Sequence, residues 1–228
     1  MTKIRLGDKE IYYQVFYKKI KNMYLRIKDD KLVITANKTH KNSIEDFIKK
    51  NETKILRVLD NQENRVPLYN KEVMLIFGFK YNIIYTIDNK KNRFNITESA
   101  IYIDFKSDDF DNQYVEKIYK KLLHNKMEKL IEEDVMLKQY FDLTNISLKT
   151  QLMKSRFGSC IAKKKIIKLN SILARFNEDY TKTILIHEII HLKVHNHQKE
   201  FYYYIDKLIP NYIEIIRSLN ALTRKYVI

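Results

Sequence analysis

Four of the chain's six histidines lie within eleven positions, in the segment I-H-E-I-I-H-L-K-V-H-N-H that begins at residue 186. They are His187, His191, His195 and His197, and Glu188 directly follows the first. Two histidines four positions apart on an α-helix differ by about 40° around its axis and about 6 Å along it, so both imidazoles can reach one metal ion. The spacing H-E-x-x-H therefore predicts a metal site on a helix.

Glu188 lies about 100° from His187 around such a helix, so its carboxylate can reach a water molecule on the metal rather than the metal itself. Zinc lowers the pKa of a bound water to roughly 7, and a neighbouring carboxylate can accept the proton as the water attacks a carbonyl. Polar side chains on a helix that is apolar on most sides need partners, and a metal supplies one. We therefore expect one zinc ion, with Glu188 as the general base. The apolar neighbours are Ile184, Leu185, Ile186, Ile189, Ile190 and Leu192.

The third ligand has to come from beyond the end of the helix. On an unbroken helix His195 would lie roughly 12 Å from His187, and three histidines in a line make a poor tetrahedral corner. Asn196 tolerates the left-handed conformation that ends many helices, and His197 follows it at once. We expect the helix to end at Asn196 and His197 to be the third ligand, with Glu200 as its main competitor. We expect His195 to orient a ligand or to face solvent.

A second stretch, S-R-F-G-S-C at residues 155–160, contains one of only three glycines in the chain. Glycine in a strand often marks the close approach of another backbone or of a ligand, although a structural bulge explains Gly158 equally well. We interpret Cys160 as a small buried residue rather than as a nucleophile or a ligand. Tyr202 follows the expected third ligand, where a phenol could stabilise an oxyanion, although tyrosines in such a run are more often packing residues.

Residues 155–212 resemble the YgjP-like metal-dependent hydrolases, which are relatives of the WLM and SprT/Spartan zincins. The resemblance is carried by S-R-F-G-S-C, by H-E-I-I-H-L-K-V-H-N-H, and by F-Y and I-P-N-Y at residues 201–202 and 209–212. More weakly, the order of the preceding elements also fits, so the resemblance covers most of the chain. It implies a base at Glu188 and zinc ligands at His187, His191 and His197. It also implies substrate contacts along the strand that carries Arg156, Gly158 and Ser159.

The chain departs from the pattern of this family at a few positions. Phe157 and Tyr202 stand where the family usually has tryptophan, and Gln198-Lys199 replaces Ser-Pro. Val194 stands at the glycine of the related motif H-E-x-x-H-x-x-G-x-x-H, so the turn before the third ligand must differ. In zincins an edge strand beside the metal pairs with the substrate backbone, and the stretch around Gly158 would be that strand or its neighbour.

The helices and strands that the sequence predicts around these residues indicate an α+β fold. We expect a β-rich N-terminal region with one helix over residues 1–108, followed by a zincin-like helix and sheet half over residues 109–228. Alternating apolar residues predict a hairpin with Asp29-Asp30 at its turn. Helical spacing predicts a helix over residues 43–59 with Ser43 as its N-cap, another over residues 111–140, and a third that starts after Asn177. Further strands are expected at residues 11–17, 73–77, 81–87, 94–96, 101–105, 146–149 and 166–169.

Composition limits the cellular context. The first ten residues carry charges instead of the apolar run of a signal peptide, and the longest apolar runs, such as residues 73–79, are too short to span a bilayer. Cys160 is the only cysteine, so the chain contains no disulfide of its own. We therefore expect a cytoplasmic protein that does not contact membranes. Abundant Lys, Asn, Ile and Tyr with scarce Gly, Pro and Trp indicate an AT-rich bacterial genome.

The net charge is +15, from 34 lysines, 9 arginines and 28 acidic residues. Phosphate recognition favours the arginine fork, so the excess of lysine favours codon bias as the main cause of this charge. The segment from Lys149 onward nevertheless carries 15 basic and 6 acidic residues, which keeps an anionic substrate as an alternative.

These observations favour a zinc-dependent metallopeptidase that acts on a peptide or protein. The first alternative keeps the zinc and acts on a phosphoanhydride, such as that of a nucleoside triphosphate. The second is a zincin that associates with nucleic acid through its N-terminal region. The absence of a Walker-type glycine loop, a zinc ribbon or a recognition-helix motif from the sequence weakens this last alternative.

Overall fold

The structure, a computed structural model, describes residues 2–28, 31–63, 66–67, 70–87, 91–106 and 110–227. It divides into two compact units, Met1–Arg65 and Val66–Ile228. The sequence pattern placed a boundary between residues 108 and 109 instead. The units divide earlier because the strands that follow residue 70 share one hydrophobic core with the long central helix and with the histidine-bearing helix.

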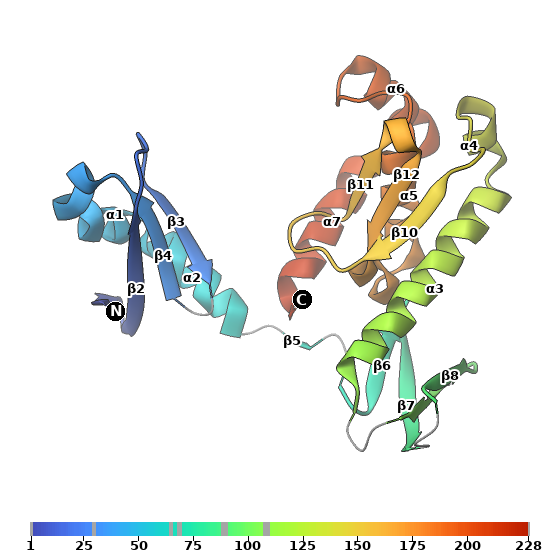
Figure 1. Cartoon of the computed structure of the whole chain (residues 1–228), viewed down its shortest axis with the longest axis horizontal. Helices are drawn as coiled ribbons and strands as arrows, with labels where there is room; N and C mark the ends of the chain where they lie inside the picture. Colours follow the sequence, from blue (N-terminus) through green and yellow to red (C-terminus); the bar gives the residue numbers. More distant parts are fainter. Residues whose placement is uncertain are drawn as a thin grey trace. The chain divides into compact units, whose positions relative to one another are not determined.

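The N-terminal unit is a four-stranded sheet covered on one face by two helices, which lie behind the strands in Figure 1. Its strand order is β1-β2-β4-β3, with β2 and β4 parallel and the other pairs antiparallel. The expected strand at residues 11–17 and the expected hairpin strands are confirmed, whereas Asp29-Asp30 lie outside the described residues. The elements are β1 (Thr2–Leu6), β2 (Lys9–Tyr17), β3 (Tyr24–Lys28), β4 (Lys31–Ala36), a 3₁₀ helix (Lys38–Ser43), α1 (Ile44–Lys50) and α2 (Glu52–Glu63).

The single helix expected over residues 43–59 is two helices, because Asn51 separates α1 from α2. The Asn51 side chain donates to the carbonyl of Phe47 at 2.8 Å, a local bond that competes with a continuous helix. Ser43 stands at the N-cap of α1, as expected, but its side chain makes no capping bond, since its hydroxyl instead donates to the carbonyl of His40 at 3.1 Å. The expected buried positions Ile44 and Ile48 do face the core.

The second unit begins with another four-stranded sheet, of order β6-β7-β9-β8. Gly78 turns the chain between β6 and β7, as expected, with φ of +87° beside +47° at Phe77. The strands β6 to β9 confirm the expected ranges. The helix expected over residues 111–140 is also present, but it is interrupted at Asp134 and so forms two helices. The elements are β5 (Val66–Pro67), β6 (Val73–Ile76), β7 (Phe79–Ile87), β8 (Arg93–Ile96), β9 (Ala100–Phe105), α3 (Asn112–Glu133) and α4 (Val135–Tyr140).

Aspartates begin both of these helices. Asp111 accepts hydrogen bonds from the backbone N–H groups of Gln113 and Tyr114, which caps α3. Asp134 accepts from the N–H of Leu137 at 3.0 Å and so starts α4 as a separate helix. The apolar spacing continues through this break, which is why it predicted one helix.

A three-stranded sheet of order β10-β12-β11 completes the core, and α3 runs alongside β10 in Figure 1. β10 pairs with β12 in parallel and β11 pairs with β12 in antiparallel orientation, so β11 is an edge strand. The elements are β10 (Ser147–Gln151), β11 (Gly158–Ile161), a 3₁₀ helix (Ala162–Lys164), β12 (Ile166–Asn170), a 3₁₀ helix (Ser171–Arg175), α5 (Glu178–Ile190), α6 (Lys199–Leu208), α7 (Tyr212–Lys225) and β13 (Tyr226–Val227), which pairs with β5. In the described part of the chain, no helix has the length and apolarity needed to cross a membrane.

Candidate metal centre

The histidine-bearing helix α5 packs against β11, β12 and α7. Asn177 caps its first turn by accepting from the N–H of Asp179 at 2.8 Å, and the acidic side chains there suit the positive end of the helix dipole. Leu185, Ile189 and Ile190 are fully buried, so the helix is held on several sides and its polar residues are fixed in place.

The helix ends earlier than the sequence predicted. α5 stops at Ile190, and the chain then turns back because the N–H groups of Lys193 and Val194 both donate to the carbonyl of Ile190. The expectation of a left-handed Asn196 is wrong, since Asn196 is not among the described residues with positive φ. The turn still directs the following segment away from the axis of α5, so that a third ligand can come from beyond the end of the helix, as expected from the sequence.

Three histidines converge at this turn. The Nε2 atom of His197 lies 3.2 Å from Nε2 of His191 and 3.3 Å from Nε2 of His187. Their potential ligand atoms all lie within 4.8 Å of one another. The two competing residues do not join this group: His195 is exposed, with Nδ1 3.3 Å from the carbonyl oxygen of His191, and Glu200 is exposed on the first turn of α6.

The opposite ring nitrogens are fixed by hydrogen bonds. His191 Nδ1 donates to the carbonyl of Val194 at 2.9 Å, and since a carbonyl only accepts, Nε2 of His191 is left with a free lone pair. His187 Nδ1 lies 2.7 Å from the hydroxyl of Tyr212, the first residue of α7. Beneath the cluster, the buried ring of Phe201 packs against all three imidazoles with centroid separations of 4.6–5.0 Å.

This donor set fits a divalent metal ion. Burial, assisted by His191 and His197, lowers the pKa of His187 to about 4, which keeps the imidazole in the neutral form that a metal requires. Lone pairs that face one another across 3.2 Å repel unless a cation or a shared proton lies between them. Imidazole nitrogen is a common ligand of zinc and of other first-row metals.

Glu188 lies next to this cluster and is only 6% exposed. Burial raises the pKa of its carboxyl to about 7, while the positive charge of Arg156 opposes the shift. The carboxylate fills the space beside Gly158, because a Cβ added at that glycine would lie 2.6 Å from Oε1 and 2.8 Å from Cγ of Glu188. The close approach that a strand glycine signalled is therefore made by the side chain of Glu188.

A groove of about 500 Å³ leads to His187 and Glu188. One wall is the segment of residues 153–158 with Arg156 and Gly158, and the other is the face of α7 that carries Tyr212, Ile216, Asn220 and Thr223. Sequence reasoning missed this second wall, although the four residues recur at helical spacing. Two expected substrate-binding residues do not line the groove: Ser159 lies further along β11, and Tyr202 is exposed on α6.

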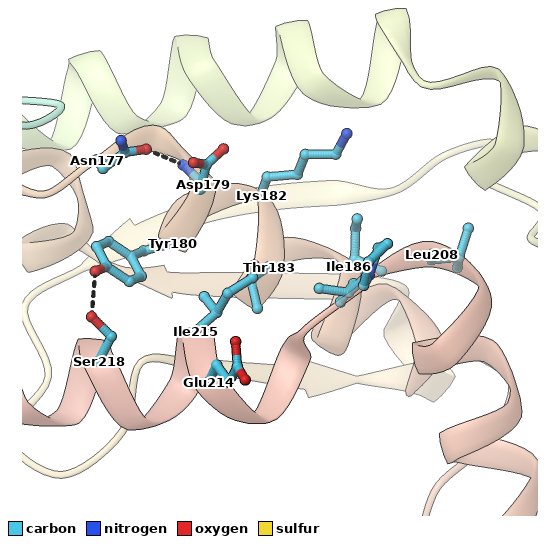
Figure 2. Close-up of a pocket in the computed structure, with 12 residues that line it drawn as sticks. Asn177, Asp179, Tyr180, Lys182, Thr183, Ile186, Leu208, Glu214, Ile215 and Ser218 are labelled. Carbon is cyan, nitrogen blue, oxygen red and sulfur yellow. Dashed lines mark hydrogen bonds between the residues drawn. The ribbon is translucent and has the colours of Figure 1, made fainter.

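The other residues flagged by the sequence have no part in the cluster. Burial raises the pKa of the Cys160 thiol to about 11, with Glu188 adding to the shift, so the thiol is protonated at neutral pH. A second cavity, of about 450 Å³, opens between α5 and the other side of α7 (Figure 2). It is bridged by a 2.8 Å contact between the hydroxyls of Tyr180 and Ser218 and includes none of the three clustered histidines.

Converging imidazoles beside a buried carboxylate are the arrangement that metal-dependent hydrolases use. The chain belongs to the YgjP-like family, because the family model of the YgjP-like metallopeptidase domain matches residues 21–222. The resemblance noted in the sequence and the α+β fold class are thereby confirmed. The family places the chain among the metallopeptidases, which act as hydrolases with a metal ion.

Metallopeptidase zymogens are among the solved structures to which the chain is similar. Abylysin from Pyrococcus abyssi shares 25% identity over 44% of this chain and 99% of its own, with a TM-score of 0.38. Jannalysin from Methanocaldococcus jannaschii shares 22% identity over 44% of this chain and 96% of its own, with a TM-score of 0.35. No curated protein matched the chain.

Proposed function

We propose that this protein is a zinc-dependent peptidase that holds one zinc ion on His187, His191 and His197 and uses Glu188 as its general base. The convergence of the three Nε2 atoms beside a buried carboxylate carries this proposal. Bound there, zinc would act as a Lewis acid toward water and toward the carbonyl of the substrate. His195 and Glu200 are not assigned a role in holding the metal.

Glu188 handles the proton in this mechanism. Its carboxylate can accept a proton from water and then return it to the leaving amine, and its burial, which raises the pKa, favours the protonated form between these two steps. Arg156 lies on the wall of the same groove, and its charge keeps the ionised form of Glu188 accessible. Gly158 leaves the room that this carboxylate needs.

A peptide suits the groove because β11 is the edge strand beside it. The described sheet pairs β11 with β12 alone, so its other edge can pair with an extended peptide. Asn220 and Thr223 on the facing wall offer polar groups to the substrate. A cytoplasmic location stays a prediction from the sequence.

One observation favours a second candidate, hydrolysis of a nucleoside triphosphate at the same centre. Lys154 and Arg156 both line the groove, which gives an anionic substrate two cationic partners. Lys163, Lys164 and Lys165 follow β11 and lie outside the residues that line this groove. Phosphate release by the purified protein, without cleavage of unfolded polypeptide, would favour this candidate.

The test is Glu188→Gln, which keeps size and hydrogen bonding and removes the base. We expect cleavage of an unfolded protein substrate to fall about 100-fold or more while bound zinc remains near one per chain. Glu200→Gln is the matched control: the same substitution on an exposed residue outside the cluster should keep activity within about twofold. Near-normal turnover by Glu188→Gln would remove the proposed base from the mechanism.

A further inference from the structure

The sheet of the N-terminal unit has one face without covering helices. Strand alternation directs Leu6, Ile11 and Ile34 into the core with α1 and α2 and turns the intervening residues outward. We call the surface formed by these outward residues of β1–β4 the outer sheet face. Its composition differs from that of an ordinary solvated sheet, because three large aromatic side chains and four cations lie on it.

The three aromatic residues of this face are exposed to solvent. Tyr12, Phe16 and Tyr24 are 41%, 45% and 55% exposed. Phe16 and Tyr24 both pair with Thr35 from opposite sides of β4, which places them roughly 10 Å apart, and Tyr12 lies four residues from Phe16 on β2, roughly 13 Å away. Strand geometry therefore spreads three separate rings over the face, each available to a planar ligand group.

Cations surround these rings. Lys3 pairs with Tyr12 across β1 and β2, and its ammonium lies 5.1 Å from the centroid of that ring. Arg5, Arg26 and Lys31 also point outward and are exposed.

Glu10 contributes a carboxylate to the outer sheet face, and it is already paired with Lys3 at 2.6 Å. Arg5, Arg26 and Lys31 therefore outnumber the acidic groups that the described strands present on this side. The first 65 residues as a whole carry 16 basic and 9 acidic residues, so the outer sheet face is more one-sided in charge than the segment that forms it.

We propose that the outer sheet face binds single-stranded nucleic acid, a function separate from the metal centre. Unpaired bases stack on exposed aromatic rings, and the backbone phosphates contact the surrounding cations. Gln14 and Thr35, between the rings, can hydrogen-bond base edges or sugars. Paired bases cannot present their faces to the rings, so a duplex would use the charges alone. An acidic peptide would likewise leave the rings without planar partners.

The test measures binding of the full-length protein to labelled 20-nucleotide oligothymidine and oligouridine, and to a 20-base-pair DNA duplex, by fluorescence anisotropy. We expect both single strands to bind more tightly than the duplex at low salt. Phe16→Ala with Tyr24→Ala should weaken single-strand binding about tenfold or more, whereas Phe16→Trp with Tyr24→Trp should retain it. The Trp variant shows that the rings are needed, and circular dichroism of each variant checks that the sheet is intact.

Charge is tested with a matched pair of triple variants. Arg5→Gln, Arg26→Gln and Lys31→Gln together should lower single-strand affinity and reduce the slope of log K against log salt by about 2. The control, Lys49→Gln, Lys50→Gln and Lys54→Gln, removes the same charge from exposed helical positions and should change affinity less than about threefold. Undetectable single-strand binding, unchanged binding by the Phe16/Tyr24 alanine variant, equal losses in both triple variants, or tighter binding of the duplex would each overturn the proposal.

Discussion

The two units differ in the polar side chains that they bury, although both expose large aromatic rings. Within the described chain, every polar or charged residue classed as buried lies in the second unit, between Asn170 and Glu188. The N-terminal unit instead buries apolar side chains and Tyr13 while exposing the rings of Tyr12, Phe16 and Tyr24. The buried set is Asn170, Ser171, Arg175, Thr181, Thr183 and Glu188.

Buried polar side chains in the second unit and exposed aromatic rings in the N-terminal unit are both features that do not by themselves favour folding. Burying a polar group is unfavourable unless it is hydrogen-bonded, and exposing a ring forgoes the gain of burial. In the second unit two of the buried polar residues, Asn170 and Glu188, line the groove, and the side chain of Asn170 donates to the carbonyls of Met153 and Arg156 at 2.8 and 2.9 Å. In the N-terminal unit the exposed rings form the outer sheet face. Each feature marks a surface that we assign to a ligand.

Removing a buried partner should give the largest loss of stability. Glu116 on α3 accepts from Arg175 at 2.7 Å and from the hydroxyl of Ser171. Glu116→Ala leaves the buried guanidinium without this carboxylate and should lower the free energy of unfolding by about 3 kcal/mol. Glu10→Ala breaks the exposed pair with Lys3 in the other unit and should leave the free energy of unfolding almost unchanged. Urea unfolding, fitted separately for each unit, measures the change in the free energy of unfolding for both variants. Equal changes would contradict the difference that we describe between the two units.

A single methyl group should disable the centre by displacing Glu188. In Gly158→Ala the new Cβ would lie within 2.6 Å of the carboxylate, so the side chain has to move. We expect peptidase activity to fall about 100-fold with a stability loss of roughly 1–3 kcal/mol. Ser159→Ala, on the next residue of the same strand, should keep activity within a few-fold. If Gly158→Ala stayed active, the position of Glu188 would not matter for catalysis.

Removing one hydroxyl should weaken metal binding by a smaller amount. Tyr212→Phe deletes the partner of His187 Nδ1 while keeping the ring in place, and affinity for zinc should fall about tenfold. Tyr203→Phe makes the same change on an exposed residue of α6 and should leave the affinity unaltered. Competition with a chelator measures both constants. Identical constants for Tyr212→Phe and the unmodified protein would show that this hydrogen bond does not orient the ligand.

The sequence predicted those parts of the site whose arrangement follows from the repeat of a single α-helix. His187, His191 and Glu188 are related by helical geometry, so their arrangement could be worked out before the fold was known. The breaks at Asn51 and Asp134 were missed because apolar spacing runs through both, whereas the breaks are made by side-chain hydrogen bonds. The end of α5 was also placed too late.

The remaining parts depend on contacts between distant segments. The role of Tyr212 follows from the packing of α7 against α5, which no local pattern contains. The division into units was misplaced for the same reason. Both four-stranded sheets have alternating sequences, and only the helices that cover them separate one core from the other.

We assign His197, and not His195, as the residue that completes the metal centre. Zinc content per chain, measured by elemental analysis after dialysis of His197→Ala and His195→Ala side by side, tests this assignment. His197→Ala removes the nitrogen that lies 3.2–3.3 Å from both other histidines and should retain well under one zinc per chain. His195→Ala removes an exposed ring outside the cluster and should retain close to one. Loss of zinc from His195→Ala with retention in His197→Ala would contradict the account.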